Sequence, residues 1–101
     1  MVSQQGGCVY IMTNKYNSVL YTGVSSELIA RVWHHKNKTY PDSFTARYNC
    51  YKLVYYCFYS RIEEAIAVEK AIKGSSREYK KQLVTSMNPD WKDLYDGLLE
   101  E

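Results

Sequence analysis

Two short runs, Cys8-Val9-Tyr10-Ile11-Met12 and Val19-Leu20-Tyr21-Thr22-Gly23-Val24, decide the fold of this 101-residue chain. Each run is rich in residues that favour strands, and each carries a tyrosine. The polar residues 14–18 lie between the runs, which predicts an antiparallel hairpin with strands over about 8–13 and 19–24. Gly23, inside the second strand, indicates a bulge or the close approach of another group.

A helix, a loop and a third strand are expected next. The helix has Ser25 or Ser26 as its cap, carries Leu28 and Val32 on its inner face and ends before Pro41. Residues 37–49 form a polar, basic loop, and loops of this length are usually functional or mobile. Residues 51–59 are aromatic and β-branched, which predicts a central strand that is apolar on both faces.

Three more helices complete the chain. A capping box at Ser60 begins a helix that runs to Gly74, and a similar signal at Ser75 begins a second one that ends before residue 88. Asp90 is expected to cap a last helix that ends near residue 98. The predicted fold is therefore α+β, with a small, mostly antiparallel three-stranded sheet in the order β-β-α-β-α-α-α. Residues 1–7 are expected to be a disordered lead-in, and residues 8–101 a single domain.

Composition narrows the function only slightly. The formal net charge is +2, from 13 Lys and Arg against 11 Asp and Glu, which does not by itself indicate nucleic-acid binding. Basic residues gather within 31–52, however, and acidic residues gather near the C-terminus. No apolar run can span a bilayer, so we expect no membrane partner. Three cysteines without paired spacing and without a secretory signal predict a reduced, cytoplasmic protein.

Glu69 is the most informative single residue. The predicted inward positions of its helix are Ile62, Ala65, Ile66 and Ile72. Glu69 falls on the same apolar stripe, and a buried charge requires a partner, a metal ion or a function. An internal ion pair, for which Arg31 is a candidate, and a functional carboxylate explain this pattern equally well.

The other polar candidates are ambiguous one by one. Packing is the stronger interpretation for Tyr10 and Tyr21, because the chain contains 11 tyrosines. Arg31 and His35 lie four residues apart on one helix face, but each is ordinarily a solvated side chain. A zinc site built from the three cysteines and the histidines fits no known zinc spacing.

In combination, these residues resemble the GIY-YIG nuclease family. The first signature triplet reads Cys8-Val9-Tyr10 and the second reads Tyr21-Thr22-Gly23. The likeness continues through Ser26-Glu27-Leu28, Arg31-Val32, His35-Lys36, Glu69-Lys70-Ala71-Ile72-Lys73-Gly74 and Asn88-Pro89-Asp90-Trp91. It covers roughly residues 8–99 and is similar to the small stand-alone bacterial members, which are related to the N-terminal catalytic domain of the excinuclease C protein.

The chain departs from the family pattern at four positions. Cys8 replaces the first glycine, and Thr22 replaces an isoleucine. Val24 stands where the excinuclease relatives carry a lysine, so that charge is missing. Ala30 stands where close relatives often have a second arginine, which would weaken phosphate contact.

The resemblance implies a metal-dependent endonuclease that hydrolyses phosphodiester bonds in DNA, with RNA as a second possible substrate. It implies that Tyr21 takes a proton from water, with Tyr10 or His35 as a relay partner. His35 is also the rival base, because an imidazole titrates near neutral pH. Arg31 would hold the scissile phosphate through its planar fork.

Two further residues would complete such a site. Glu69 would bind one Mg²⁺ or Mn²⁺, which would act as a Lewis acid. Asn88 would orient Glu69 or a metal-bound water. The enzyme would be structure-directed and would act in DNA repair or recombination.

Several residues would contact the nucleic-acid backbone. Gly23 would let the strand approach a phosphate closely, and Lys36, Lys38, Arg47 and Lys73 would contact phosphates without reading sequence. Each of these charges, taken alone, is ordinarily a solvated one. The chain has no sequence-reading module, so targeting would depend on DNA shape, a protein partner or an oligomer. The sequence does not indicate an oligomeric state.

Two other hypotheses stay open. In the first, the chain is a non-hydrolytic nucleic-acid-binding module that acts through a partner. In the second, it is a small interaction domain. In the interaction domain, Glu69 and Arg31 would pair internally, and Tyr10 and Tyr21 would merely pack.

Overall fold

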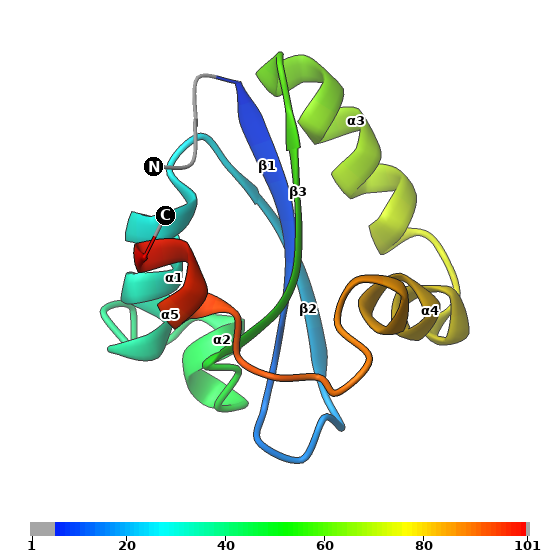
Figure 1. The fold of residues 1–101 in the computed structure, drawn as a ribbon. Helices are drawn as coiled ribbons and strands as arrows, with labels where there is room; N and C mark the ends of the chain where they lie inside the picture. Colours follow the sequence, from blue (N-terminus) through cyan, green and yellow to red (C-terminus); the bar gives the residue numbers. More distant parts are fainter. Residues whose placement is uncertain (1–5, 101) are drawn as a thin grey trace.

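The computed structural model describes residues 6–100 and contains one sheet with helices on both of its faces (Figure 1). Strands β1 (Gly7–Thr13), β2 (Leu20–Ser25) and β3 (Lys52–Tyr59) form an antiparallel sheet in the order β2-β1-β3. The helices are α1 (Leu28–Lys36), α2 (Phe44–Arg47), α3 (Ile62–Lys73), α4 (Arg77–Met87) and α5 (Tyr95–Leu99). The predicted α+β fold with a three-stranded antiparallel sheet is confirmed. In the described part of the chain, no helix is long and apolar enough to cross a membrane.

The central strand is β1, and all of its residues are buried. Its ladder with β2 runs from Cys8 opposite Ser25 to Thr13 opposite Leu20, which confirms the predicted hairpin. The prediction of a central strand over 51–59 was wrong, because β3 is an edge strand. This strand carries apolar side chains on both of its faces, because helices cover both faces of the sheet.

The first strand begins one residue earlier than predicted. Gly7 opens β1 and is buried, as is Gly6. A Cβ atom on Gly7 would lie 2.8 Å from the Ala65 Cβ of α3, so this strand end packs directly on the helix. The predicted lead-in therefore does not extend to residue 7, and its residues 1–5 lie outside the described part.

The two faces of the sheet carry different helices. α1, α2 and α5 lie on one face, and α3 and α4 lie on the other (Figure 1). Leu28 of α1 and Leu98 of α5 pack with Tyr10 of β1. Val9 packs with α3, and Ile11 packs with α4. Because side chains alternate along a strand, β1 supplies both layers of the core.

Helix α1 follows the predicted pattern, with Leu28 and Val32 buried on its inner face. The predicted cap at Ser25 or Ser26 is wrong, because the N-cap residue is Glu27; Ser25 Oγ accepts a hydrogen bond from the Glu27 N–H (2.9 Å). Residues 37–49 are not a continuous loop, because α2 lies within them. Ser43 caps α2 by accepting from the Ala46 N–H (3.3 Å).

The inward stripe of α3 consists of Ala65, Glu69 and Ile72, as predicted. Ile66, which was also expected to point inward, is 38 % exposed. The expected capping box at Ser60 does not form, because the N-cap residue is Arg61. The Ser60 hydroxyl instead donates to the Glu64 carboxylate (3.2 Å).

The last two helices differ in how well their ends were predicted. Ser76, one residue after the predicted Ser75, caps α4 by accepting from the Tyr79 N–H (3.1 Å), and α4 ends at Met87 as expected. Asp90 does not cap α5. Asp93 Oδ1 instead accepts from the Tyr95 N–H (3.1 Å) and from the Leu53 N–H of β3 (3.2 Å), so one carboxylate joins the last helix to the sheet.

Candidate active site

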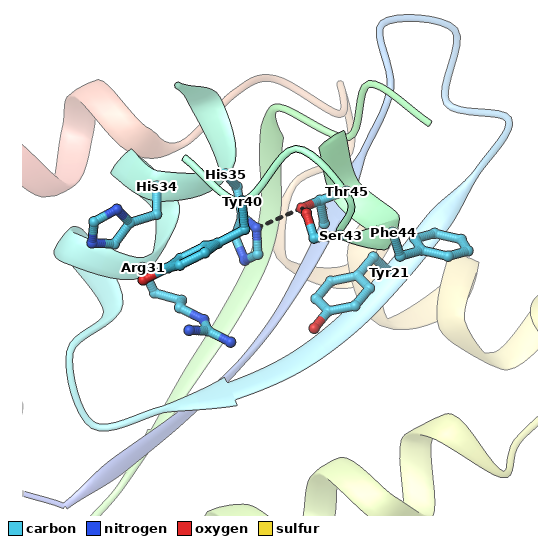
Figure 2. A pocket seen from close by; sticks show the side chains of 8 residues that line it. All are labelled: Tyr21, Arg31, His34, His35, Tyr40, Ser43, Phe44 and Thr45. Atoms are coloured by element: carbon cyan, nitrogen blue, oxygen red, sulfur yellow. Dashed lines mark hydrogen bonds between the residues drawn. The ribbon is translucent and has the colours of Figure 1, made fainter. Parts of the chain in front are cut away.

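A pocket of about 270 Å³ opens beside β2, between α1 and α2 (Figure 2). It is lined by Tyr21, Arg31, His34, His35, Tyr40, Ser43, Phe44 and Thr45. The Tyr21 hydroxyl and the Arg31 guanidinium extend toward the same open side of this pocket, over β2 (Figure 2). The fold thus brings together three of the predicted site residues, Tyr21, Arg31 and His35.

Tyr10 adjoins these residues and is fully buried. Its hydroxyl lies 2.9 Å from His35 Nε2, and its ring centroid lies 6.3 Å from that of Tyr21. His35 Nδ1 lies 2.7 Å from Thr45 Oγ1. A neutral imidazole has one N–H, so one of these nitrogens donates and the other accepts. Both nitrogens are therefore engaged, and His35 joins β1 to α2.

The electrostatic state of this group follows from burial and from Arg31. Burial, followed by the charges of Arg31 and His34, lowers the pKa of His35 to about 4. Burial also raises the pKa of Tyr10, with a further contribution from Tyr21, whereas Arg31 acts in the opposite direction. The hydrogen bond to Tyr10 raises the pKa of Arg31. At neutral pH the group therefore holds a neutral imidazole, a protonated Tyr10 phenol and the fixed positive charge of Arg31.

Gly23 is required by the position of the Tyr10 ring. The two residues are partners in the β1–β2 ladder. A Cβ atom on residue 23 would lie 2.5 Å from both Cζ and Oη of Tyr10. The close approach that the sequence indicated at Gly23 is therefore made by a tyrosine ring, which fills the space that was expected to admit a phosphate.

Glu69 belongs to α3, on the other face of the sheet, and is 8 % exposed. Its Oε2 lies 2.9 Å from Nζ of Lys73, one helical turn later. Within residues 6–100 Lys73, and not Arg31, is the ion-pair partner of Glu69. Lys73 Nζ lies 6.0 Å from the centroid of the Tyr21 ring. Lys73, the partner of Glu69, therefore approaches Tyr21 around the edge strand β2.

The chemistry of Glu69 fits a hard divalent cation that is bound together with a substrate. Its Oε2 faces Lys73, and its side chain is 11 % exposed. Among residues 6–100, no group of three or more His, Cys, Asp and Glu side chains is placed to hold a metal ion. Mg²⁺ does not need such a cage, because it commonly binds one or two carboxylates and keeps waters and phosphate oxygens as its other ligands.

Asn88 does not join this group. Its Nδ2 donates to the carbonyl oxygens of Val54 (3.2 Å) and Lys92 (2.7 Å), and its Oδ1 accepts from the Lys92 N–H (3.1 Å). Both amide hydrogens are thus used to fix the turn after α4 against β3. The predicted action of Asn88 on Glu69 or on a metal-bound water does not agree with these partners.

Three of the four basic residues predicted to contact phosphates already have partners in the protein. Lys36 forms an ion pair with Asp93. Lys38 Nζ donates to Asn49 Oδ1 (2.7 Å), and Lys73 pairs with Glu69. The fourth, Arg47, is exposed beside the ring of Tyr48.

The sequence interpretation missed the residues that the α2 segment contributes. Thr45 bonds to His35, and Phe44 stacks on Tyr21 with ring centroids 5.8 Å apart. A signal was present, because Ser43 directly after Pro41 and Asp42 is a typical helix start. It was hidden within a segment that was interpreted as loop.

A second missed feature is the hydroxyl of Thr22. It lies between Tyr21 and Gly23 in sequence but points to the opposite face of β2, against which α3 packs. In the described part of the chain its Oγ1 is buried without a hydrogen-bond partner. At the position where the resemblance predicts an isoleucine, this chain thus buries an unsatisfied polar atom.

Of three comparisons with known proteins, one, with models of protein families, gives a match. No curated protein and no solved structure matches the chain. The GIY-YIG catalytic domain matches residues 6–82. That range contains Tyr10, Tyr21, Arg31, His35 and Glu69, and it ends before Asn88. Since the match covers well over half of the sequence, the chain belongs to the GIY-YIG family of nuclease domains.

Proposed function

We propose that this domain is a divalent-metal-dependent endonuclease that hydrolyses DNA phosphodiester bonds, is directed by the structure of its substrate and acts in repair or recombination. One observation carries the proposal. Tyr21 and Arg31 extend to the same open side of one pocket, and the nearly buried Glu69 is linked to that side through Lys73, beside the Tyr21 ring. Hydrolysis of a phosphodiester requires activation of the attacking water, stabilisation of negative charge on the phosphate oxygens, and stabilisation of the departing oxygen. Tyr21, Arg31 and a cation on Glu69 would supply these in turn.

Arg31 is the phosphate-binding residue in this proposal. Its guanidinium is exposed, extends into the opening and is held from one side by the Tyr10 phenol. A planar guanidinium can donate two parallel hydrogen bonds to phosphate oxygens. Among the described residues, Arg31 has no carboxylate partner within 4 Å, so its charge is available to a substrate.

Tyr21 is a better candidate than His35 for accepting a proton from the attacking water, once its own phenolic proton has passed to solvent on the open side of the pocket. Its hydroxyl faces the opening, whereas both nitrogens of His35 already have partners. The pKa of His35, lowered to about 4, makes its imidazole a poor base at neutral pH. Tyr10 and His35 then act as positioning residues that fix the pocket wall behind Tyr21 and Arg31.

Glu69 is the residue that would hold Mg²⁺ or Mn²⁺. When bound, such an ion supplies Lewis-acid stabilisation to the phosphate and to the leaving oxygen. Glu69 itself would exchange Lys73 for the cation. Lys73, which is about half exposed, would then be released toward the phosphate backbone.

The Glu69–Lys73 pair also favours a second candidate. With its carboxylate neutralised by Lys73, the domain would be a nucleic-acid-binding module without hydrolytic activity that acts through a protein partner. The two candidates differ in their response to metal ions and in the effect of removing the carboxylate charge.

The test is cleavage of a panel of branched, nicked, duplex and single-stranded DNA and RNA, with and without Mn²⁺ and Mg²⁺. We expect wild-type protein to cut at least one branched DNA when metal is present. Glu69→Gln should abolish cutting while the far-UV circular dichroism spectrum stays the same. Glu63→Gln is a matched control on the exposed face of α3, and it should cut normally.

Tyr21→Phe separates the two candidate bases. We expect this variant to bind DNA and to lose cutting, because only the phenolic oxygen is removed. Undiminished cutting would transfer the role of base to His35. The absence of cutting in all substrates and metals, with DNA binding retained, would support the non-hydrolytic module instead.

A further inference from the structure

A row of aromatic rings leads out of the candidate active site along α2. The Tyr21 ring stacks on Phe44, with centroids 5.8 Å apart and an interplanar angle of 27°. Phe44 in turn meets Tyr48, with centroids 4.6 Å apart. Phe44 is 43 % and Tyr48 47 % exposed, so this row lies on the surface and not in the core.

The row ends in a second pocket, a groove of about 470 Å³ between the β1–β2 turn, the end of α1 and the segment that follows α2. It is lined by Asn14, Lys15, Tyr16, Lys36, Lys38, Tyr48, Asn49 and Tyr51. Three of these side chains are tyrosines, three are lysines and none is acidic. The most exposed ring, that of Tyr16, is 73 % accessible.

Cations lie beside these rings. Lys15 Nζ is 5.0 Å from the centroid of Tyr16, and Arg47 Cζ is 6.0 Å from that of Tyr48. Exposed rings with interleaved cations suit a ligand that has both flat apolar faces and negative charge. A single nucleic-acid strand has both, because its unpaired bases can stack on rings while its phosphates contact lysine and arginine. A duplex hides its base faces and could use only the cations.

We infer that the Phe44–Tyr48 row and the lysine-lined groove bind a single-stranded segment of nucleic acid that runs away from the candidate active site. The inference deepens the proposed function, on which it rests, by naming the substrate class as one with an unpaired strand next to the point of cutting. Tyr48 and Tyr16 are the stacking residues. Lys15, Lys38 and Arg47 contact the backbone, and Lys38 exchanges its hydrogen bond to Asn49 for a phosphate.

The test measures binding without cleavage. Fluorescence anisotropy of a labelled 12-nucleotide oligothymidine, and of a duplex of the same length, is followed with the Glu69→Gln protein in metal-free buffer. In this background, Tyr48→Ala and Tyr16→Ala should each weaken binding of the single strand about fivefold or more. Duplex binding should change less than about twofold. Both rings are exposed, and thermal melting checks that the variants fold.

Two controls separate stacking from charge. Tyr79→Ala removes a tyrosine of similar exposure on α4, away from the groove, and should leave both affinities unchanged. Lys38→Ala should reduce the slope of log Kd against log salt concentration by about 0.7, whereas Tyr48→Ala should leave that slope unchanged.

The inference is overturned if the single strand does not bind, if the Tyr48 and Tyr16 variants bind it normally, or if they weaken duplex binding equally. These outcomes can be told apart from a failure of the proposed function. A protein that cuts DNA but binds single strands independently of Tyr48 contradicts only this inference. A protein that never cuts, yet binds single strands through Tyr48, contradicts only the proposed endonuclease activity.

Discussion

Gly23→Ala should destabilise the protein through one contact, that with the Tyr10 ring. The added Cβ would lie 2.5 Å from Cζ and Oη of Tyr10, well inside van der Waals contact. The ring cannot move freely, because it is fully buried and its hydroxyl is bonded to His35. Overpacking costs about 1–3 kcal/mol. Loss of the Tyr10–His35 hydrogen bond adds about 1 kcal/mol, and the better strand preference of alanine returns about 0.5 kcal/mol.

The expected net loss in the free energy of unfolding is thus about 1.5–3.5 kcal/mol, measured by urea titration with linear extrapolation. A double-mutant cycle isolates the contact. In a Tyr10→Leu background the ring is absent, so Gly23→Ala should cost nothing or stabilise slightly. The coupling energy should be at least about 1 kcal/mol. Equal destabilisation by Gly23→Ala in both backgrounds would refute the claim that Gly23 is required by the position of the Tyr10 ring.

Three further predictions concern His35, Thr22 and Asn88. The pKa of His35 is lowered to about 4, below its unfolded value of about 6.5. The contribution of neutral His35 to the free energy of unfolding should therefore be fully present above pH 6.5 and should fall by about 2 kcal/mol as the pH drops to 4, a figure reduced for partial solvent access. Urea titrations of wild type and His35→Gln check this, and a loss of the same size in both would contradict it. Thr22→Val removes the buried hydroxyl that lacks a partner and should raise the free energy of unfolding by about 1 kcal/mol, seen as a higher Tm; an unchanged or lower Tm would show that this oxygen is satisfied. Asn88→Ala leaves the Val54 carbonyl oxygen without its side-chain donor and should cost about 2 kcal/mol in urea titration, while cleavage by the folded variant stays normal; lost cleavage in a stable variant would restore its predicted role in the site.

Local patterns were enough to predict the hairpin, α1, α3 and α4. The strand periodicity of residues 8–24 and the buried pair Leu28 and Val32 need no knowledge of the rest of the chain. The strand order could not be predicted in this way. Residues 51–59 are apolar on both sides, as a central strand would be, because helices cover both faces of the sheet, yet β3 lies at its edge.

The candidate site was predicted in part. Tyr10, Tyr21, Arg31 and His35 do meet, but Glu69 lies on the other face of the sheet, and only its partner Lys73 approaches Tyr21. That relation depends on which strand lies at the edge, which is a property of the whole fold.

Two contacts were accessible from sequence and were overlooked. The spacing of Glu69 and Lys73 is that of a helical ion pair, and it outweighs a distant partner such as Arg31. The register of the hairpin places Gly23 opposite Tyr10, which identifies the close neighbour of the glycine. By contrast, no local signal predicts that Thr45 of α2 bonds to His35, because that contact depends on how the segment between α1 and β3 folds back.

The central claim is that Glu69, Tyr21 and Arg31 share one space around the edge of β2. Paramagnetic broadening of NMR signals by Mn²⁺, in the presence of a short DNA strand, tests this most directly. We predict that Mn²⁺ broadens the ring signals of Tyr21 and the guanidinium signals of Arg31 more strongly than those of Tyr95 in α5, on the face of the sheet away from α3, and that Glu69→Gln abolishes the effect. Broadening that spares Tyr21, or that persists in Glu69→Gln, would contradict the account.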